Sequence, residues 1–333
     1  MKIGIIKSTP TISPTGGVRI QALMWKDGLE NLGHTCHLIN MWEENDWSSY
    51  DIIIIMEYGG NFRSWICGLS KHNKNIAFAP ILDPAWGKRK YKFFAKYWGS
   101  HKYLGLTSRF RDLYDCAKYA KLYLTRSNQE TEFLSYCCDI PKEKIAQVPL
   151  SLRFDPLSEM PPKEPFCFHA SRLCSTNKNV ARLIQAAIKY DFPLVLAGYL
   201  HGKKEEKWLH NLIDGHKNIQ YVGTVTDEEL CNYYQRAKVF ALPSLTEGVG
   251  MVALEAAGYG CEIVLTNVGA PKDYFQGRAA LVDPYSVDEI GQSVASCLEK
   301  GYSQPELLQF IKDNYTVKAC TIKLENAIKQ LYM

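Results

Sequence analysis

The chain has 333 residues, a length that favours two domains over a single hydrophobic core. Charged residues make up 22% and hydrophobic residues 46% of the chain, which is ordinary for a globular protein. The net charge of +4 is mild and does not indicate nucleic acid, a partner that usually needs a concentrated basic face.

The eleven cysteines follow no metal-binding spacing, and a core of this size needs no disulfides. We interpret them as free thiols in a reducing compartment. The apolar run within Met1–Lys7 is too short for a signal peptide, and the longest aliphatic run, Ile52–Met56, is too short to span a bilayer. We therefore expect a cytoplasmic protein, either soluble or peripheral at the inner membrane face.

Short apolar runs alternate with helical patterns through the first half of the chain. Helices are expected over Val18–Asn31, Phe62–His72, Ser108–Ala120 and Asn128–Cys138. Strands are expected over Lys2–Lys7, Thr35–Asn40, Asp51–Met56, Asn75–Ala79, Tyr103–Leu106 and Lys121–Leu124. This alternation predicts a parallel sheet with right-handed crossovers.

The same alternation starts again after Pro156. Strands are expected over Phe166–His169, Leu194–Ala197, Ile219–Val222, Lys238–Leu242, Glu262–Leu265 and Ala279–Val282. Helices are expected over Lys178–Lys189, Glu205–Asp214, Asp227–Arg236, Val249–Gly258 and Val287–Glu299. We therefore predict two doubly wound α/β domains, 1–156 and 157–315, in which ligands bind at the carboxyl ends of the strands.

Two segments fall outside this alternation. Asp155–Pro165 contains four prolines, which excludes a helix or a central strand and predicts an interdomain linker. The final helical stretch, 316–333, is expected to pack back on the first domain.

A glycine pair, Gly16-Gly17, lies between the first strand and the first helix. Such a junction lets the backbone approach an anion, and a helix N-terminus supplies free N–H groups. A plain tight turn explains the pair equally well. The junction lacks the G-x-G-x-x-G spacing of a dinucleotide fold, which disfavours a dehydrogenase.

Several candidates follow strands of the second domain. Arg172 and Lys178 flank a polar loop, where two cations suit a diphosphate, although they are also explained as solvated loop residues. Gly198 and Gly223 end the next two strands, where a nucleotide could approach the backbone or the strands could simply stop.

Two carboxylates stand out eight residues apart in the chain, Glu247 and Glu255. Glu255 is the only charged residue of an otherwise apolar helical segment, so burial would require a partner from the protein or from a ligand. Glu247, with the adjacent Gly248-Val249-Gly250, precedes that helix. It can meet a ligand hydroxyl, or it can be an acid favoured by the helix dipole.

Together these residues resemble the retaining glycosyltransferases of family 4, which have the GT-B fold. Glu247 and Glu255 match that family's pair of glutamates, and Arg172 and Lys178 match its diphosphate-binding Arg and Lys. Gly16-Gly17 match its first glycine loop. Asn267–Asp273 looks like its Gly-Gly-x-Pro-Glu loop, and Gly248-Val249-Gly250 stands where the family usually has Gly-Phe-Gly.

The resemblance implies two Rossmann-like domains facing each other across a cleft that binds a UDP- or GDP-linked sugar. It assigns hydroxyls of the transferred sugar to Glu247, the ribose to Glu255, and the leaving diphosphate to Arg172 and Lys178. Gly16, Gly17, Gly198, Gly223 and Gly248-Val249-Gly250 would complete the donor site. The implied reaction is hexosyl transfer (EC 2.4) to a glycan, lipid-linked or protein acceptor, with retention and with no metal or other cofactor.

The first domain departs from the family pattern. The segment 78–86 lacks the histidine that many members carry near the transferred sugar. Asp83 is the nearest polar group and our candidate for that catalytic role, although an Asp before Pro84 also suits a turn.

The segment 84–103 contains six Lys/Arg residues, seven aromatics and no acid. Lys88, Lys92 and Lys96 recur on one helical face, and Tyr91, Phe94 and Trp98 fall on another. This pattern suits a helix on an anionic membrane, an acceptor-binding wall, or a partly buried surface helix whose lysines are merely solvated.

Three other classes of function compete with a sugar transferase. A nucleotide-sugar epimerase would need an acid/base set that the sequence does not show. A dehydrogenase is disfavoured by the first glycine loop. A catalytically inactive GT-B subunit that binds a glycan or a partner is the main alternative to a transferase.

Overall fold

The computed structural model describes residues 1–7, 17–40, 43–59, 61–82, 87–98, 100–101, 106–107 and 109–332. It divides into two compact units, residues 1–151 with 317–333, and residues 152–316. The division falls after Ser151, whereas the sequence places it at residue 156. Asp83 and Gly16, two of the expected site residues, lie outside the described part of the chain.

The first unit is built on a parallel sheet with the strand order β2-β1-β3-β4-β7-β8. Its strands are β1 (Lys2–Lys7), β2 (Thr35–Leu38), β3 (Ile52–Met56), β4 (Ile76–Ala79), β7 (Leu122–Thr125) and β8 (Ile145–Gln147). The helices are α1 (Gly17–Asn31), α2 (Phe62–Leu69), α3 (Lys88–Phe93), α4 (Arg109–Cys116), α5 (Asn128–Cys138) and α13 (Val317–Lys329).

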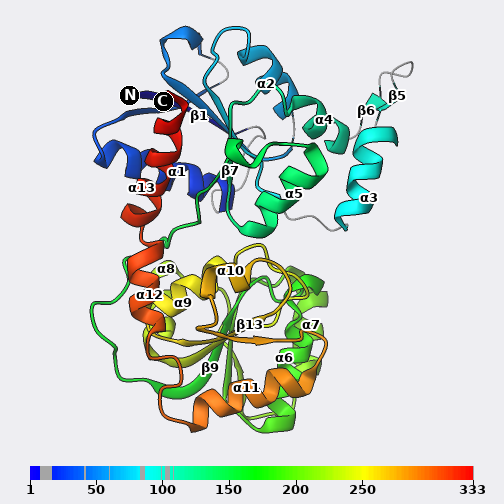
Figure 1. Ribbon diagram of the computed structural model, residues 1–333. Coiled ribbons are helices and arrows are strands. Elements are labelled where there is room, and N and C mark those ends of the chain that lie inside the picture. The colour runs from blue at the N-terminus through cyan, green and yellow to red at the C-terminus, as the bar shows by residue number, and fades with distance from the viewer. Residues whose placement is uncertain are drawn as a thin grey trace. The chain divides into compact units, whose positions relative to one another are not determined.

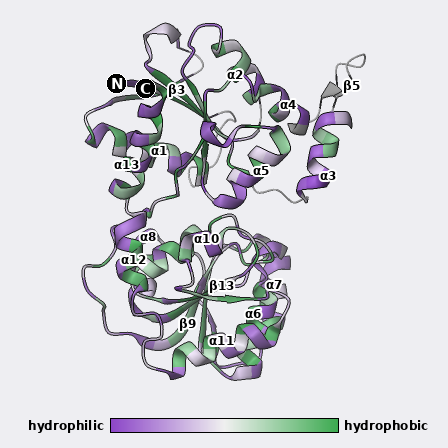
Figure 2. Cartoon of the chain, in the orientation of Figure 1, coloured by the Kyte–Doolittle hydropathy of each residue, from purple (hydrophilic) through white to green (hydrophobic). Residues whose placement is uncertain are grey.

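The first sheet is buried on both faces because its strands are almost continuously apolar. Successive residues of β3 point to opposite sides, so Ile53 and Ile55 pack with α2, α4 and α5, while Ile52 and Ile54 pack with α1 and α13. Figure 2 shows hydrophobic residues gathered along β3. The C-terminal helix α13 lies beside α1 (Figure 1), with its apolar side chains in the same cluster as those of α1.

The second unit repeats the design with the strand order β11-β10-β9-β12-β13-β14, again parallel. Its strands are β9 (Glu164–Ala170), β10 (Leu194–Ala197), β11 (Ile219–Tyr221), β12 (Ala237–Leu242), β13 (Glu262–Thr266) and β14 (Ala280–Val282). Its helices are α6 (Val180–Tyr190), α7 (Gly202–Ile213), α8 (Asp227–Arg236), α9 (Met251–Gly258), α10 (Pro271–Phe275), α11 (Val287–Glu299) and α12 (Leu307–Tyr315). The predicted fold class, two doubly wound α/β units, is confirmed.

Two expected elements differ in the structure. The sixth strand of the first sheet is β8, not Tyr103–Leu106. Only Leu106 of that range is described, and it belongs to β6 (Leu106–Thr107), which pairs antiparallel with β5 (Ser100–His101) in a separate ribbon. The final helical stretch is preceded by α12, which the sequence analysis leaves unassigned.

The proline-rich segment Asp155–Pro165 is not the connection between the units. The chain crosses from one unit to the other after Ser151, and this segment lies on the second unit. Lys163 Nζ donates to the carbonyls of Tyr234 at 2.9 Å and Tyr259 at 2.7 Å, and Leu157 N donates to Gly258 O at 2.9 Å. Residues 155–163 form no helix or strand, as expected, and hydrogen bonds hold them against the second unit. The exclusion of a central strand was wrong for Glu164 and Pro165, which begin β9 inside the second sheet. A proline is tolerated as an opening residue of a strand.

Candidate functional site

The loop that carries Glu247 follows β12 and leads into α9 at the carboxyl edge of the second sheet. Its backbone pairs with the loop after β13, since Glu247 N donates to Val268 O at 3.2 Å and Ala270 N donates to Glu247 O at 3.2 Å. Gly269, at φ +107°, lies so close that a Cβ there would collide with the Glu247 carbonyl oxygen. The loop between β13 and α10 therefore fixes the position of Glu247.

Replacing Gly269 by alanine is expected to destabilise the protein more than replacing Gly277. Both glycines have positive φ, but a Cβ on Gly277 meets nothing within 4 Å. Gly277→Ala should cost about 1–2 kcal/mol from backbone strain, and Gly269→Ala should cost an additional ~1–3 kcal/mol from the collision. Urea unfolding of the two variants measures the difference, and equal losses would contradict the tight approach at Gly269.

The structure brings Lys178 and Glu247 together. Lys178 Nζ lies 2.9 Å from Glu247 Oε2, although the two residues are far apart in the chain. Asn177 ties the same two loops: its side chain donates to Thr246 O at 2.9 Å and accepts from Thr246 N at 3.2 Å. Two of the residues expected at the donor site thus belong to one hydrogen-bonded constellation.

Arg172 lies on the same loop as Lys178 and its side chain is exposed. Within the described part of the chain, its guanidinium has no hydrogen-bond or ion-pair partner. The neighbouring strand ends are closely packed: Gly198 N donates to Gly223 O at 2.8 Å, and a Cβ on Gly198 would collide with Ser171 O. Arg172, Gly198 and Gly223 therefore meet at the carboxyl ends of β9, β10 and β11, as the sequence predicts for them.

The buried His169, in β9, links β12 to the start of the Arg172 loop. Its Nδ1 donates to Ala241 O at 2.7 Å and its Nε2 accepts from Ser171 Oγ at 2.7 Å. Burial lowers the pKa of His169 to about 4, so the ring is neutral near pH 7. A neutral ring that joins β12 to the Arg172 loop is a structural support, which the sequence analysis did not single out.

The pH dependence of stability should therefore change when His169 is replaced by glutamine. The unfolded ring titrates near 6.5, so the unfolded chain binds more protons than the folded protein between pH 6.5 and 4. His169 stabilisation is present above this window and is lost as the pH falls through it, by roughly 3 kcal/mol. Urea unfolding at pH 7 and pH 4 should show a smaller loss in His169→Gln than in the wild type; equal losses would contradict the buried neutral ring.

Glu255 has a partner from the protein. Arg153 Nε donates to Glu255 Oε1 at 2.5 Å and Arg153 Nη2 donates to Oε2 at 3.0 Å. The buried Tyr234 hydroxyl lies 3.4 Å from Oε2. Burial raises the pKa of Glu255 and the Arg153 guanidinium opposes that rise. Sequence reasoning missed Arg153, because it lies about a hundred residues before Glu255 and nothing local links the two.

The first unit places a buried ion pair beside the segment that leads to Asp83. Glu130, at 2% exposure, accepts from Leu82 N at 2.5 Å and from Arg126 N at 2.6 Å. Arg126 Nη2 donates to Leu82 O at 3.1 Å. Both residues lie at the carboxyl edge of the first sheet, at the end of β7 and the start of α5. Sequence reasoning missed this pair because a Glu near a helix start usually needs no explanation beyond the dipole.

The basic segment forms α3, which continues into a π-helical turn over Phe94–Trp98. Two of its three spaced lysines are ion-paired with α5 and the residue after it: Lys88 with Glu132 at 2.5 Å and Lys92 with Asp139 at 2.6 Å. Figure 2 shows α3 as a largely hydrophilic helix.

The aromatic side chains of this segment divide between buried and exposed positions. Tyr91 is buried and packs against Phe133, with ring centroids 4.5 Å apart. The exposed rings are Phe93 at 50% and Tyr97 at 67%. The helix thus turns Tyr91 into the core of the first unit, as in a partly buried surface helix, although Lys88 and Lys92 are ion-paired and not merely solvated.

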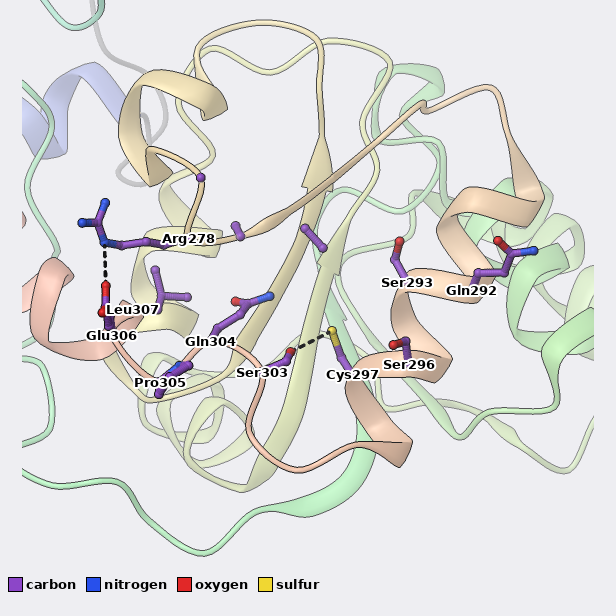
Figure 3. Close-up of a pocket in the computed structure, with 13 residues that line it drawn as sticks. Arg278, Gln292, Ser293, Ser296, Cys297, Ser303, Gln304, Pro305, Glu306 and Leu307 are labelled. Atoms are coloured by element: carbon purple, nitrogen blue, oxygen red, sulfur yellow. Dashed lines mark hydrogen bonds and ion pairs between the residues drawn. The ribbon is translucent and has the colours of Figure 1, made fainter.

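A cavity of ≈ 730 Å³ lies away from the predicted site. It is bordered by α11, the start of β14 and the segment 303–307, so it opens at the amino ends of the strands (Figure 3). A smaller cavity of ≈ 420 Å³ adjoins the Arg172 loop and is lined in part by Ser175, Thr176 and Leu245. The larger cavity thus lies at the opposite edge of the sheet from the Lys178–Glu247 ion pair.

Three general findings bear on membranes, metals and redox state. None of the helices among the described residues is both long and apolar enough to cross a bilayer. Over the same residues, no group of three or more His, Cys, Asp or Glu side chains could hold a metal ion. All eleven cysteines are free thiols.

The sequence of the second unit is similar to those of known glycosyltransferases. Residues 155–316 match the family model of "Glycosyl transferases group 1". The chain is 25% identical over 252 residues to O-antigen chain mannosyltransferase B of Escherichia coli, covering 66% of this chain and 64% of that protein. It is 33% identical over 108 residues to the D-inositol 3-phosphate glycosyltransferase of Pseudarthrobacter chlorophenolicus, covering 32% of this chain and 26% of that protein. The chain thus spans less than two thirds of the length of either relative.

The fold comparison extends over both units. A glycosyltransferase from Rickettsia africae ESF-5 superposes with a TM-score of 0.74 at 15% identity, covering 99% of each chain. The architecture is therefore that of the GT-B proteins, with two Rossmann-like domains. Its second domain is similar to those of the group 1 glycosyl transferases.

Proposed function

We propose that this protein is a retaining glycosyltransferase of family 4 that uses a UDP- or GDP-linked sugar. One observation carries the proposal: the Lys178–Glu247 ion pair lies on the strand edge that also presents the unpaired Arg172. This constellation lies within the segment that matches the group 1 glycosyl transferases. Ligands of doubly wound sheets bind at this edge.

The residues divide the work as follows. Arg172 and Lys178 bind the diphosphate and neutralise the charge that develops on it as it leaves. Glu247 accepts hydrogen bonds from hydroxyls of the transferred sugar, and Lys178 holds that carboxylate in place. Gly198, Gly223 and the backbone of Gly248-Val249-Gly250 allow the nucleotide and sugar to approach closely. Glu255 binds the ribose hydroxyls.

The reaction needs no metal and no dedicated base in this scheme. The acceptor oxygen bonds to the anomeric carbon on the face from which the phosphate oxygen departs, so configuration is retained. The departing phosphate oxygen takes the proton of the acceptor hydroxyl. Two protein cations supply the charge stabilisation that a divalent ion would otherwise give.

The first unit is assigned to the acceptor, which we propose is a glycan, a lipid-linked sugar or a protein. Gly16 and Gly17 would face the donor phosphates, and Asp83 would act near the transferred sugar. The Arg126–Glu130 pair supports this role, since it anchors Leu82 directly before Asp83. The E. coli relative is named for the O-antigen chain and for mannose. We therefore propose a mannosyl donor and a polysaccharide or glycoconjugate product.

A transfer assay tests the proposed function. The protein is incubated with UDP- and GDP-linked sugars, including mannose, with and without hydroxyl acceptors, and nucleoside diphosphate release is measured. One donor should be consumed in an acceptor-dependent reaction without added metal, and the product should keep the donor's anomeric configuration by NMR. No release from any donor would favour a catalytically inactive GT-B subunit, and an inverted product would remove the assignment to a retaining family.

We further propose that the protein is cytoplasmic and that α3 and the π-helical turn after it attach it to an anionic membrane surface. Phe93 and Tyr97 are exposed one helical turn apart, and Arg89 and Lys90 are exposed beside them. Replacing both rings by alanine should reduce co-sedimentation with anionic vesicles at low salt at least about threefold. Tyr285→Ala, which removes a ring of 63% exposure from the second unit, is the control and should bind like the wild type. No binding by the wild type would remove this proposal.

A further inference from the structure

The Glu255 carboxylate is covered on its more exposed side by Arg153. Both carboxylate oxygens accept from the guanidinium, at 2.5 and 3.0 Å. The Glu255 side chain is only 1% exposed, whereas the Arg153 side chain is 19% exposed. The third contact, the Tyr234 hydroxyl, comes from a fully buried residue. A ligand that approaches this carboxylate from solvent therefore meets Arg153 first.

Arg153 also has a second carboxylate within reach. Its Nη1 lies 3.2 Å from Asp227 Oδ1, and the Asp227 side chain is 69% exposed. The guanidinium packs 4.5 Å from the centroid of the Phe154 ring. Asp227 and Phe154 can therefore hold the guanidinium if it releases Glu255, so that the released arginine is not left without a partner.

We propose that Arg153 is a positioning residue that caps Glu255 in the donor-free protein and yields to the donor. Ribose hydroxyls take over one or both guanidinium hydrogen bonds on Glu255, while Asp227 retains the displaced arginine. The inference rests on the proposed function, since it assumes that Glu255 binds ribose. It makes Arg153 and Asp227 determinants of donor affinity, although neither belongs to the residues expected to touch the donor.

The test compares nucleotide binding by variants of the full chain. Arg153→Lys keeps the positive charge but loses the bidentate hydrogen bonding of the planar guanidinium to both Glu255 carboxylate oxygens. Titration calorimetry with UDP and GDP, and with their 2′-deoxy counterparts, measures both affinity and the contribution of the ribose hydroxyl. In Arg153→Lys, the nucleotide that the wild type binds should bind at least about threefold more tightly, and its preference over the 2′-deoxy form should grow.

Arg236→Lys is the matched control. Arg236 makes the same bidentate contact with Glu164, at 2.6 and 2.9 Å, but at the amino ends of the strands. It should leave both affinities unchanged. Weaker or unchanged nucleotide binding by Arg153→Lys would overturn the inference, because the pair would then be a structural ion pair.

A second variant keeps the proposal testable if Arg153 cannot be replaced. Asp227→Asn removes the alternative partner of the guanidinium at an exposed position, so nucleotide binding should weaken at least about threefold with little change in stability. Unchanged binding would again contradict the proposal. Failure of the proposed function looks different: neither UDP nor GDP would bind the wild type, or binding would not depend on Arg172.

Discussion

Replacing Glu247 by glutamine is expected to slow sugar transfer at least about tenfold, equivalent to ~1.4 kcal/mol of transition-state stabilisation. Glutamine keeps the shape of the side chain but loses the charge that pairs with Lys178 at 2.9 Å. The hydroxyls of the transferred sugar would lose an ionised acceptor. Because the backbone of residue 247 is held by Val268 and Ala270, the loop itself should keep its conformation.

The measurement is the initial rate of nucleoside diphosphate release at saturating donor, accompanied by thermal unfolding of each protein. Glu164→Gln is the control, since it removes an exposed ion-paired carboxylate of the same unit at the opposite edge of the sheet. Its rate should equal that of the wild type. A near-normal rate in Glu247→Gln would rule out a catalytic role for this carboxylate.

Replacing Arg172 by alanine is expected to reduce transfer by a similar factor, about tenfold or more, with almost no loss of stability. The side chain is exposed, and no hydrogen bond or ion pair to it is found in the described residues. A folding role for it is therefore small. Its expected contribution arises only when an anionic diphosphate is bound and departs.

A lower transfer rate with unchanged stability would separate a functional role of Arg172 from a role in folding. Arg236→Ala removes another exposed arginine, which is paired with Glu164, and should change transfer little. Rates and unfolding midpoints of the two variants are compared side by side. A normal transfer rate in Arg172→Ala, or a loss of activity only in proportion to lost stability, would contradict the proposed binding of the diphosphate by Arg172.

Much of the fold could be predicted because buried parallel strands leave a strong sequence pattern. Lys2–Lys7 and Leu194–Ala197 match β1 and β10, and Asp227–Arg236 matches α8, which begins with a capping box at Thr226 and Glu229. β8 escaped prediction because three residues between two lysines and a proline carry too little periodicity. Tyr103–Leu106 carried a stronger apolar pattern but does not supply the sixth strand of the sheet.

The site could be predicted in part. Residue types at strand ends indicated Arg172, Lys178 and Glu247, and the structure joins the last two through an ion pair. The partner of Glu255 could not be predicted, because Arg153 lies about a hundred residues earlier and nothing local links them. His169 was missed for a similar reason: its role depends on a carbonyl of a neighbouring strand, Ala241 O.

The central claim is that a nucleotide-diphosphate sugar binds at the carboxyl edge of the second sheet. Thermal unfolding of the wild type and of Arg172→Ala, each with a panel of UDP- and GDP-linked sugars, tests it most directly. One donor should raise the unfolding midpoint of the wild type, since a ligand at a hundred times its Kd stabilises by about 2.7 kcal/mol. The same donor should shift Arg172→Ala much less. No shift with any donor, or equal shifts in both proteins, would contradict the account.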